Sequence, residues 1–225
     1  MQFRDRREAG RLLGQKLLQY ARNDGPLDEW LVEALPRGGV PVGYEVASAI
    51  NARLGVFIVR KLGVPGDPEL AMGAIASGGA CLLNQGVIED LGIPPELIQA
   101  AIDREKSVLK AREAAYGIAL NPTDFSGKFV VLVDDGAATG ATMRVAIQAL
   151  RQHNARRILV ALPTMATHIA RQLRAEADGV VSLIESDLFA SVGQWFQNFS
   201  QTTDEEVVEY LKKSTNRPLN MGRTL

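Results

Sequence analysis

The sequence is poor in the residues that build disulfide frameworks, metal centres and membrane spans. Its 225 residues include a single cysteine, Cys81, which excludes an intrachain disulfide framework. The two histidines, His153 and His168, lie far from any cysteine or acid cluster with the spacing of metal ligands, so we expect no structural metal. No apolar run reaches membrane-spanning length, and the charged N-terminus has no signal-peptide core. We therefore expect a cytoplasmic protein that contacts no membrane.

A strong charge of one sign is also absent. The formal net charge is −1, so no global field draws the chain to nucleic acid. Residues 3–22 intersperse leucines with charged residues and predict an amphipathic helix. We expect its arginines to be solvated or paired with Asp5 and Glu8, and these arginines are Arg4, Arg6, Arg7 and Arg11. Hydrophobic residues make up 46% of the chain, which supports one sizeable core in a single domain over 1–225.

The stretch 130–142 carries the clearest chemical signal. Four consecutive branched apolar residues, Val130 to Val133, are typical of a strand buried on both faces. Asp134 and Asp135 follow at the end of this strand, and residues 143–153 show the apolar spacing of a helix. Small residues connect the acid pair to the helix, and they are Gly136, Ala137, Ala138, Thr139, Gly140, Ala141 and Thr142.

This connecting loop is suited to bind an anion. The first N–H groups of a helix have no intrahelical partner, and the helix dipole adds positive potential there. Gly136 and Gly140 allow a close backbone approach, and the hydroxyls of Thr139 and Thr142 can donate to phosphate oxygens. The acid pair instead suits sugar hydroxyls or a hydrated divalent cation. A phosphorylated sugar is the simplest ligand that satisfies both.

A second strand–loop–helix unit precedes this one. A predicted strand over 31–35 and a predicted helix over 41–54 flank Arg37, Gly38 and Gly39. The Arg37 guanidinium and outward-facing backbone N–H groups are suited to phosphate. An ordinary glycine turn with a solvated arginine is the alternative.

Strands alternate with helices over residues 30–184, which predicts an α/β fold, a doubly wound and mostly parallel sheet with right-handed crossovers. Ligands of such sheets lie at the C-terminal ends of the strands. We therefore expect Arg37, Lys61 and the acid pair at one edge. The further expected elements are strands at 56–59, 158–162 and 180–184 and a helix at 167–177.

The remaining segments are less informative. Residues 61–73 are rich in glycine and proline and predict an irregular loop. Residues 74–83 predict a hairpin around Gly78-Gly79. A charged helix is expected at 94–116, without an assigned chemical role, and another begins at Asp204 and runs to about residue 213.

The stretch 130–142 resembles the phosphoribosyl pyrophosphate (PRPP) signature of type I phosphoribosyltransferases, with its apolar strand, two acids, small loop and Thr-Gly-x-Thr. Further similarity to a bacterial group of these enzymes covers most of residues 1–212, and is carried by Phe3-Arg4-Asp5-Arg6 with Glu8-Ala9-Gly10, Leu35-Pro36-Arg37-Gly38-Gly39-Val40-Pro41-Val42, Arg60-Lys61-Leu62-Gly63 and Val192-Gly193-Gln194-Trp195-Phe196. The resemblance implies a homodimer whose subunit has a core at about 30–184, a small hood from about 1–25 and 185–213, and a frayed tail at 214–225.

The resemblance also implies an activity: Mg²⁺-dependent transfer of the 5-phosphoribosyl group from PRPP to a small nucleobase-like acceptor, with release of pyrophosphate. The loop 137–142 would hold the 5′-phosphate. Asp134 and Asp135 would accept hydrogen bonds from the ribose hydroxyls, directly or through Mg²⁺ hydration. Arg37 with the Gly38 and Gly39 amides would hold the pyrophosphate.

Four further residues receive roles from the resemblance. Arg60 and Lys61 would meet the pyrophosphate at the mobile catalytic loop, which closes over PRPP and shields the reacting centre from water. A surface loop with a solvated Arg-Lys pair is the alternative. Trp195 or Phe196 would stack on the acceptor, although packing against the N-terminal helix is an equal alternative. Ala138 stands where some purine enzymes carry an aspartate, which argues against a hypoxanthine or guanine enzyme of that pattern.

Three other classes of protein share parts of this pattern. Response-regulator receiver domains also place two acids after an apolar strand, but near the N-terminus and without a role for Thr139-Gly140-x-Thr142. A regulatory protein that binds PRPP or a nucleotide without catalysis is the main alternative. Nucleic-acid binding is opposed by the near-zero net charge and the lack of a basic stripe. The acceptor, its general base and the oligomeric state stay open.

Overall fold

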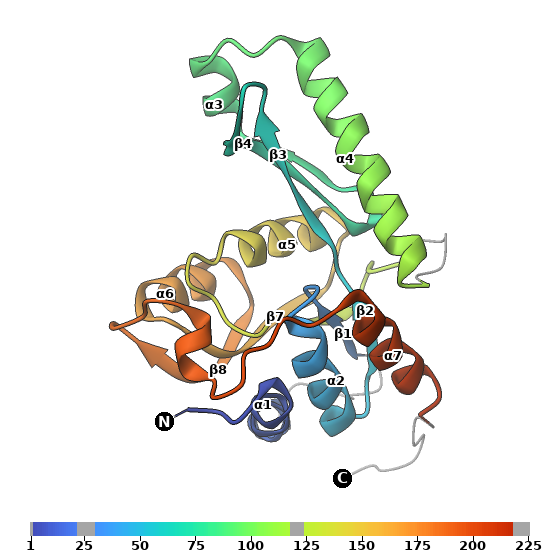
Figure 1. Ribbon diagram of the computed structural model, residues 1–225, viewed down its shortest axis with the longest axis vertical. Coiled ribbons are helices and arrows are strands. Elements are labelled where there is room, and N and C mark those ends of the chain that lie inside the picture. Colours follow the sequence, from blue (N-terminus) through green and yellow to red (C-terminus); the bar gives the residue numbers. More distant parts are fainter. Residues whose placement is uncertain (1, 22–29, 118–123, 218–225) are drawn as a thin grey trace.

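The computed structural model describes residues 2–21, 30–117 and 124–217. Its centre is a five-stranded sheet in which all neighbouring strands are parallel, in the order β2-β1-β6-β7-β8 (Figure 1). The strands are Trp30–Ala34 (β1), Arg53–Val56 (β2), Phe129–Val133 (β6), Arg157–Ala166 (β7) and Gly179–Ser186 (β8). The predicted α/β fold with a mostly parallel, doubly wound sheet is confirmed.

Helices cover both faces of this sheet. Leucines of α1 (Arg6–Ala21) and valines of α2 (Gly39–Ile50) pack on one face, against Val131 and Val133. The helices α5 (Ala141–Gln152) and α6 (Thr167–Glu176) pack on the other face, against Val130 and Leu132. These four β6 residues are at most 1% exposed, so the strand is buried on both faces as its composition predicted.

A second, antiparallel sheet projects from the central one, and we refer to residues 59–115 as the arm (Figure 1). Its strands β3, β4 and β5 pair in that order. Two helices complete it. The elements are Val59–Val64 (β3), Asp67–Ala76 (β4), Cys81–Leu83 (β5), Gln85–Asp90 (α3) and Pro95–Ala115 (α4). A 3₁₀ turn, Ser77–Gly79, joins β4 to β5 and confirms the predicted hairpin.

The irregular loop predicted at 61–73 is wrong, because most of these residues form the β3–β4 hairpin. The glycines and prolines that suggested a loop fall at its turn, where Gly66 has φ 89°, and at register shifts around Gly63. The strand predicted at 56–59 is also wrong. The edge strand β2 ends at Val56, and β3 begins at Val59 in the other sheet, so Lys61 is not at the end of a parallel strand.

Several element boundaries differ from expectation. The strand β7 continues through Pro163 to Ala166, where it also pairs with β8. The helix α2 stops at Ile50, since Asn51 adopts the left-handed conformation at φ 56°. The last helix, α7 (Asp204–Thr215), is capped by Thr203 rather than Asp204, with Glu206 completing a capping box. The expected hood residues 22–25 and tail residues 218–225 lie outside the described part of the chain.

The segment before α1 lies alongside residues 192–199. The Phe3 N–H donates to the Trp195 carbonyl at 2.8 Å, and the Phe3 carbonyl accepts from the Gln197 N–H at 2.8 Å. The rings of Phe3 and Phe196 lie 5.5 Å apart. Segments almost 200 residues apart in the sequence are therefore joined by backbone hydrogen bonds and aromatic packing.

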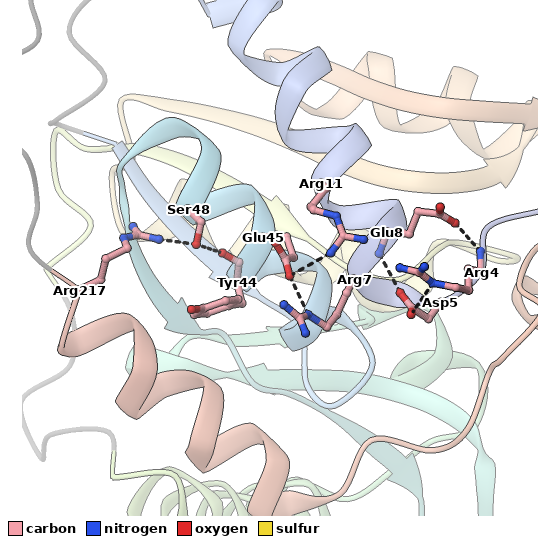
Figure 2. Close-up of polar contacts among 9 residues, drawn as sticks. All are labelled: Arg4, Asp5, Arg7, Glu8, Arg11, Tyr44, Glu45, Ser48 and Arg217. Atoms are coloured by element: carbon pink, nitrogen blue, oxygen red, sulfur yellow. Dashed lines mark hydrogen bonds and ion pairs between the residues drawn. The ribbon is translucent and has the colours of Figure 1, made fainter.

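Charged contacts fix α1 and the C-terminal segment to α2 (Figure 2). Glu45, on α2, is 9% exposed and pairs with Arg7 at 2.8 Å and Arg11 at 3.7 Å. Arg217 donates to the Ser48 hydroxyl and to the Ala47 carbonyl. Of the four arginines predicted to be solvated or locally paired, Arg4, which precedes α1, pairs with an expected partner, Asp5. Arg7 and Arg11 instead pair with Glu45.

We expect Leu13→Ala to lower the free energy of unfolding by about 2–5 kcal/mol, because Leu13 is fully buried between α1 and the sheet and truncation leaves a cavity. Urea unfolding monitored by circular dichroism measures the change. Leu97→Ala, at a position 45% exposed on α4, is the matched control and should have a much smaller effect. Equal losses in the two variants would contradict the packing of α1 as a core element.

Candidate active site

The acid pair stands where β6 ends, pressed against the loop that follows β1. The strands β1 and β6 are neighbours, and the Leu35 N–H donates to the Val133 carbonyl at 2.8 Å. A Cβ atom on Gly38 would overlap Asp135 Oδ2, and one on Gly39 would lie 2.9 Å from the Asp134 Cα. Any larger residue at 38 or 39 would collide with the pair. The two loops that the sequence singled out therefore meet at one edge of the sheet.

Arg6 reaches the acid pair from the start of α1. Its Nε donates to Asp135 Oδ2 at 2.8 Å, and its NH1 group donates to the Ser200 carbonyl at 2.6 Å. The guanidinium also lies 3.9 Å from the centre of the Phe199 ring. The side chains of Arg6 and Asp135 are only 10% and 14% exposed, so this ion pair is largely shielded from water. Arg6 thus ties the N-terminal segment and residues 199–200 to the acid pair.

Asp134 and Asp135 are both buried, and burial disfavours the charged form of each carboxyl. Burial and the adjacent Asp135 charge raise the pKa of Asp134 well above its usual value, although the Asp135 N–H donates to Asp134 Oδ1 at 2.8 Å. Burial also raises the pKa of Asp135, against the opposing attraction of Arg6. A cation placed beside the pair would favour its charged form. The buried acid pair is therefore suited to a ligand or ion that brings positive charge beside it.

The loop after the acid pair leads directly into α5. Gly140 has φ 68° and occupies the N-cap position of this helix, and the Thr139 hydroxyl lies 3.5 Å from the Ala141 N–H. Ala137 exchanges two backbone hydrogen bonds with the end of β7, which holds the loop in place. Thr139 and Thr142 are among the loop residues with accessible side chains. The structure therefore places two accessible hydroxyls at the N-terminus of a 12-residue helix, where the sequence predicts an anion site.

Arg37 lies at the tip of the neighbouring loop, after a cis peptide bond to Pro36. Its guanidinium is 3.7 Å from Asp204 at the start of α7. Asp204 also accepts a hydrogen bond from the Tyr116 hydroxyl at 2.5 Å. Burial, together with the Asp204 hydrogen bond, raises the pKa of Tyr116 to about 12, so the phenol stays protonated as the donor.

The structure separates Arg60 and Lys61 from this edge of the sheet, since both lie on β3 in the arm. Arg60 makes two hydrogen bonds to Glu105 Oε2 on α4, at 3.0 and 2.7 Å. These contacts hold β3 against α4 within the arm. Lys61 has an exposed side chain on the same strand, with a charged or hydrogen-bonding partner of its own.

The two candidate acceptor residues differ in accessibility. Phe196 is 5% exposed and packs between Phe3 and Phe199, with ring centres 5.5 and 5.1 Å away. Trp195 is partly exposed and lies 6.0 Å from Phe189. Phe196 therefore serves the packing of the N-terminal segment. Trp195 keeps ring surface for a ligand.

Arg6 is the site residue that sequence reasoning missed. The helix pattern groups it with the solvated or locally paired arginines, but its partner is 129 residues away. The only available signal was its presence in the stretch Phe3-Arg4-Asp5-Arg6, which the family resemblance includes. Helix periodicity carries no information about a contact over that separation.

We expect Asp134→Asn to stabilise the protein at high pH and not at low pH. A carboxyl whose pKa is raised by folding contributes stability below its unfolded pKa, near 3.8, and loses that contribution as the pH rises through the folded value. The asparagine variant has no such loss, so its Tm should exceed that of the wild type at pH ~8 and not at pH ~4. Each kcal/mol corresponds to roughly 2–4 °C for a chain of this size.

Differential scanning calorimetry across this pH range measures the effect. Asp90→Asn is the matched control, because Asp90 is exposed on α3. A Tm difference between Asp134→Asn and wild type that is the same at every pH would show that the carboxyl is not held in its neutral form.

Comparison with known proteins supports the signature in the sequence. A family model described as "Phosphoribosyl transferase domain" matches residues 5–195. The Mycobacterium tuberculosis protein named "Putative phosphoribosyl transferase Rv0571c" is 40% identical over 212 residues; the alignment covers 94% of this chain and 47% of that protein, so the chain spans about half the length of the curated relative. The crystal structure of TT1426 from Thermus thermophilus is 38% identical with a TM-score of 0.81, and the match covers 95% of this chain and 99% of that one. The chain therefore belongs to the type I phosphoribosyltransferase family.

Proposed function

We propose that this protein is a Mg²⁺-dependent phosphoribosyltransferase, which transfers the 5-phosphoribosyl group of PRPP to a small nucleobase-like acceptor and releases pyrophosphate. The observation that carries the proposal is the contact between two loops. The acid pair, followed by a glycine loop at the start of α5, lies against Gly38 and Gly39 with no room for a side chain between them. Phosphate-binding backbone on both sides of two carboxylates suits a sugar that bears phosphate groups at both ends.

The loop 137–142 is the proposed 5′-phosphate site. Backbone N–H groups at the start of α5 face it, and the hydroxyls of Thr139 and Thr142 are accessible beside them. Asp134 and Asp135, immediately before this loop, would accept hydrogen bonds from the 2′- and 3′-hydroxyls. The short distance along the chain between the two groups matches the short distance between the 5′-phosphate and the ribose hydroxyls.

The pyrophosphate would lie on the loop after β1. Arg37 and the N–H groups of Gly38 and Gly39 are its proposed partners. Lys61 and Arg60 are proposed to approach from the arm. Arg60 is held against α4 by Glu105, whereas the Lys61 side chain is exposed, so Lys61 is the better candidate for direct contact with the leaving group.

The donor set fits a magnesium ion that is shared with the substrate. Mg²⁺ is usually bound by one or two carboxylates together with waters and substrate phosphates, and here Asp134 and Asp135 supply the carboxylates. Within residues 2–21, 30–117 and 124–217, no group of three or more His, Cys, Asp or Glu side chains is placed to hold a metal. When bound, the ion would neutralise the pyrophosphate and make it a better leaving group.

The acid pair would stabilise the transition state by its charge. Positive charge develops on the ribose as the bond to pyrophosphate breaks, and preorganised carboxylates beside it lower the barrier. That positive charge also favours ionisation of carboxyls whose pKa values burial raises. Arg6 holds one Asp135 oxygen and so fixes the direction of the carboxylate.

The acceptor is proposed to stack on Trp195, since Phe196 is buried. Ala138 offers no acid or base to the acceptor, which argues against a hypoxanthine or guanine substrate read by an aspartate at that position. A nucleobase-like ring other than these fits the exposed aromatic surface best.

A regulatory protein that binds PRPP without transfer is the second candidate. The Arg6 ion pair favours it, because the guanidinium offsets part of the Asp135 charge, which transfer would use to stabilise a cationic ribose and which binding alone does not need. We also propose a homodimer in the cytoplasm that acts without nucleic acid. Among the described helices, none is long and apolar enough to cross a membrane.

Calorimetric titration of PRPP with Mg²⁺ into the protein tests the sugar-phosphate site. We expect binding by the wild type and a loss of about tenfold or more in Asp134→Asn/Asp135→Asn, because the ribose and the metal lose their carboxylates. Glu89→Gln/Asp90→Asn neutralises another adjacent acid pair, exposed on α3, and should bind PRPP as the wild type does.

Absence of PRPP binding by the wild type would refute the proposed substrate. Binding that the double aspartate variant retains would refute the proposed site. Binding without pyrophosphate release, over a panel of nucleobases and related heterocycles, would favour the regulatory candidate.

A further inference from the structure

A cavity lies away from the candidate active site, between the β2 edge of the central sheet and the C-terminal half of α4. Its volume is about 660 Å³. Ligand cavities commonly measure roughly 300–1,000 Å³. Its apolar wall includes Leu54, Val56, Leu109, Phe125 and Leu211. The family signature assigns no role to this cavity, which lies on the face of the sheet opposite α2.

One ionisable side chain in the lining of the cavity is buried. Glu33, in β1, lines the cavity and is only 4% exposed. No described residue donates a hydrogen bond to its carboxyl or pairs with it, and burial raises its pKa to about 8. An unpaired buried polar group costs stability unless it receives a partner. A carboxyl in this state can take that partner from a ligand.

The neighbouring strand leaves space for this carboxyl. Gly55, opposite Glu33 in β2, has no side chain, and a Cβ atom there would overlap Glu33 Oε1. Any other residue at this position would displace the carboxyl. The sheet therefore accommodates Glu33 at the cavity wall.

The α4 side of the cavity, across from Glu33, also carries positive charge. Lys106 and Lys110 line the cavity from one face of α4 and are exposed, one turn apart, with Glu113 on the next turn. Two exposed lysines in the lining, against the single acid Glu113 on this helix, favour an anionic group and disfavour a cationic ligand. A neutral carboxyl inside offers one donor and one acceptor side by side. The complementary partner is an amide-type or nucleobase-type edge, which also presents a donor beside an acceptor.

We propose that this cavity binds a small anionic molecule with a nucleobase-like or amide-type edge. The edge pairs with Glu33, the ring or apolar body lies against Leu109 and Phe125, and the anionic group lies at Lys106 and Lys110. The cavity is distinct from the proposed PRPP site, because Glu33 points to the sheet face and not to the strand ends that carry Asp134 and Arg37.

Adenosine 5′-monophosphate is the probe for this site, since its base has an N–H donor beside a ring-nitrogen acceptor and its phosphate is anionic. Calorimetry on the full-length protein should detect binding. Glu33→Leu should weaken binding about tenfold or more, because it removes the polar partner of the base. Glu33→Gln should preserve most of it, because an amide also presents a donor and an acceptor. Lys110→Glu should weaken binding, whereas Arg171→Glu, an exposed charge reversal on α6, should not.

One further probe separates the two ends of the site. Adenosine lacks the phosphate, so its affinity should fall in Glu33→Leu but not in Lys110→Glu. Thermal unfolding serves as the folding control, and Glu33→Leu should have a Tm at least equal to that of the wild type because it removes an unpaired buried carboxyl. No detectable binding of adenosine 5′-monophosphate would overturn the proposal. Equal affinity in wild type and Glu33→Leu would place the nucleotide elsewhere, including the candidate active site, and would also overturn it.

Discussion

Two adjacent carboxylates at the end of a buried strand are the constraint on which the candidate active site depends. Asp134 and Asp135 repel each other in a setting where burial already disfavours charge, so the surrounding structure has to hold them there. The packing of Gly38 and Gly39 against the pair and the Arg6 ion pair do so. Each of these contacts comes from a different part of the chain. Docking of α1 and the neighbouring loop is therefore required for the site as much as for the core.

The order of the strands explains why the two loops meet. Because β1 lies beside β6 with both strands parallel, the loop at Arg37 and the loop at 136–142 leave the sheet at the same edge. One glycine-rich turn before a helix offers a place for one phosphate. Two such turns on neighbouring strands, with carboxylates between them, are the reason why we propose a sugar that carries phosphates at both ends as the ligand.

The parts of this structure that the sequence predicts well are those set by local pattern. The run 130–133 is buried on both faces, and the loop after Asp135 enters α5, because both depend on neighbours within a few residues. The β3–β4 hairpin was missed because glycine and proline mark its turn and bulges as readily as they mark a loop. The contact of Arg6 with Asp135 and the cavity at Glu33 depend on residues distant in the sequence. The only local sign of this cavity in the sequence was Glu33, an isolated glutamate in the apolar strand pattern from Trp30 to Leu35.

The cavity at Glu33 and the candidate active site are connected through Tyr116. Tyr116 lines the cavity, its hydroxyl donates to Asp204 at 2.5 Å, and Asp204 lies 3.7 Å from Arg37. Energetic coupling through this contact requires two arrangements that the two sites favour differently. Such coupling acts equally in both directions. A molecule in the cavity would change the affinity of the Arg37 loop for its ligand by some factor. A ligand on that loop would change the affinity of the cavity for its molecule by the same factor. Tyr116 is the residue through which such coupling would pass, because it lines the cavity and its hydroxyl, whose pKa burial raises to about 12, donates to Asp204.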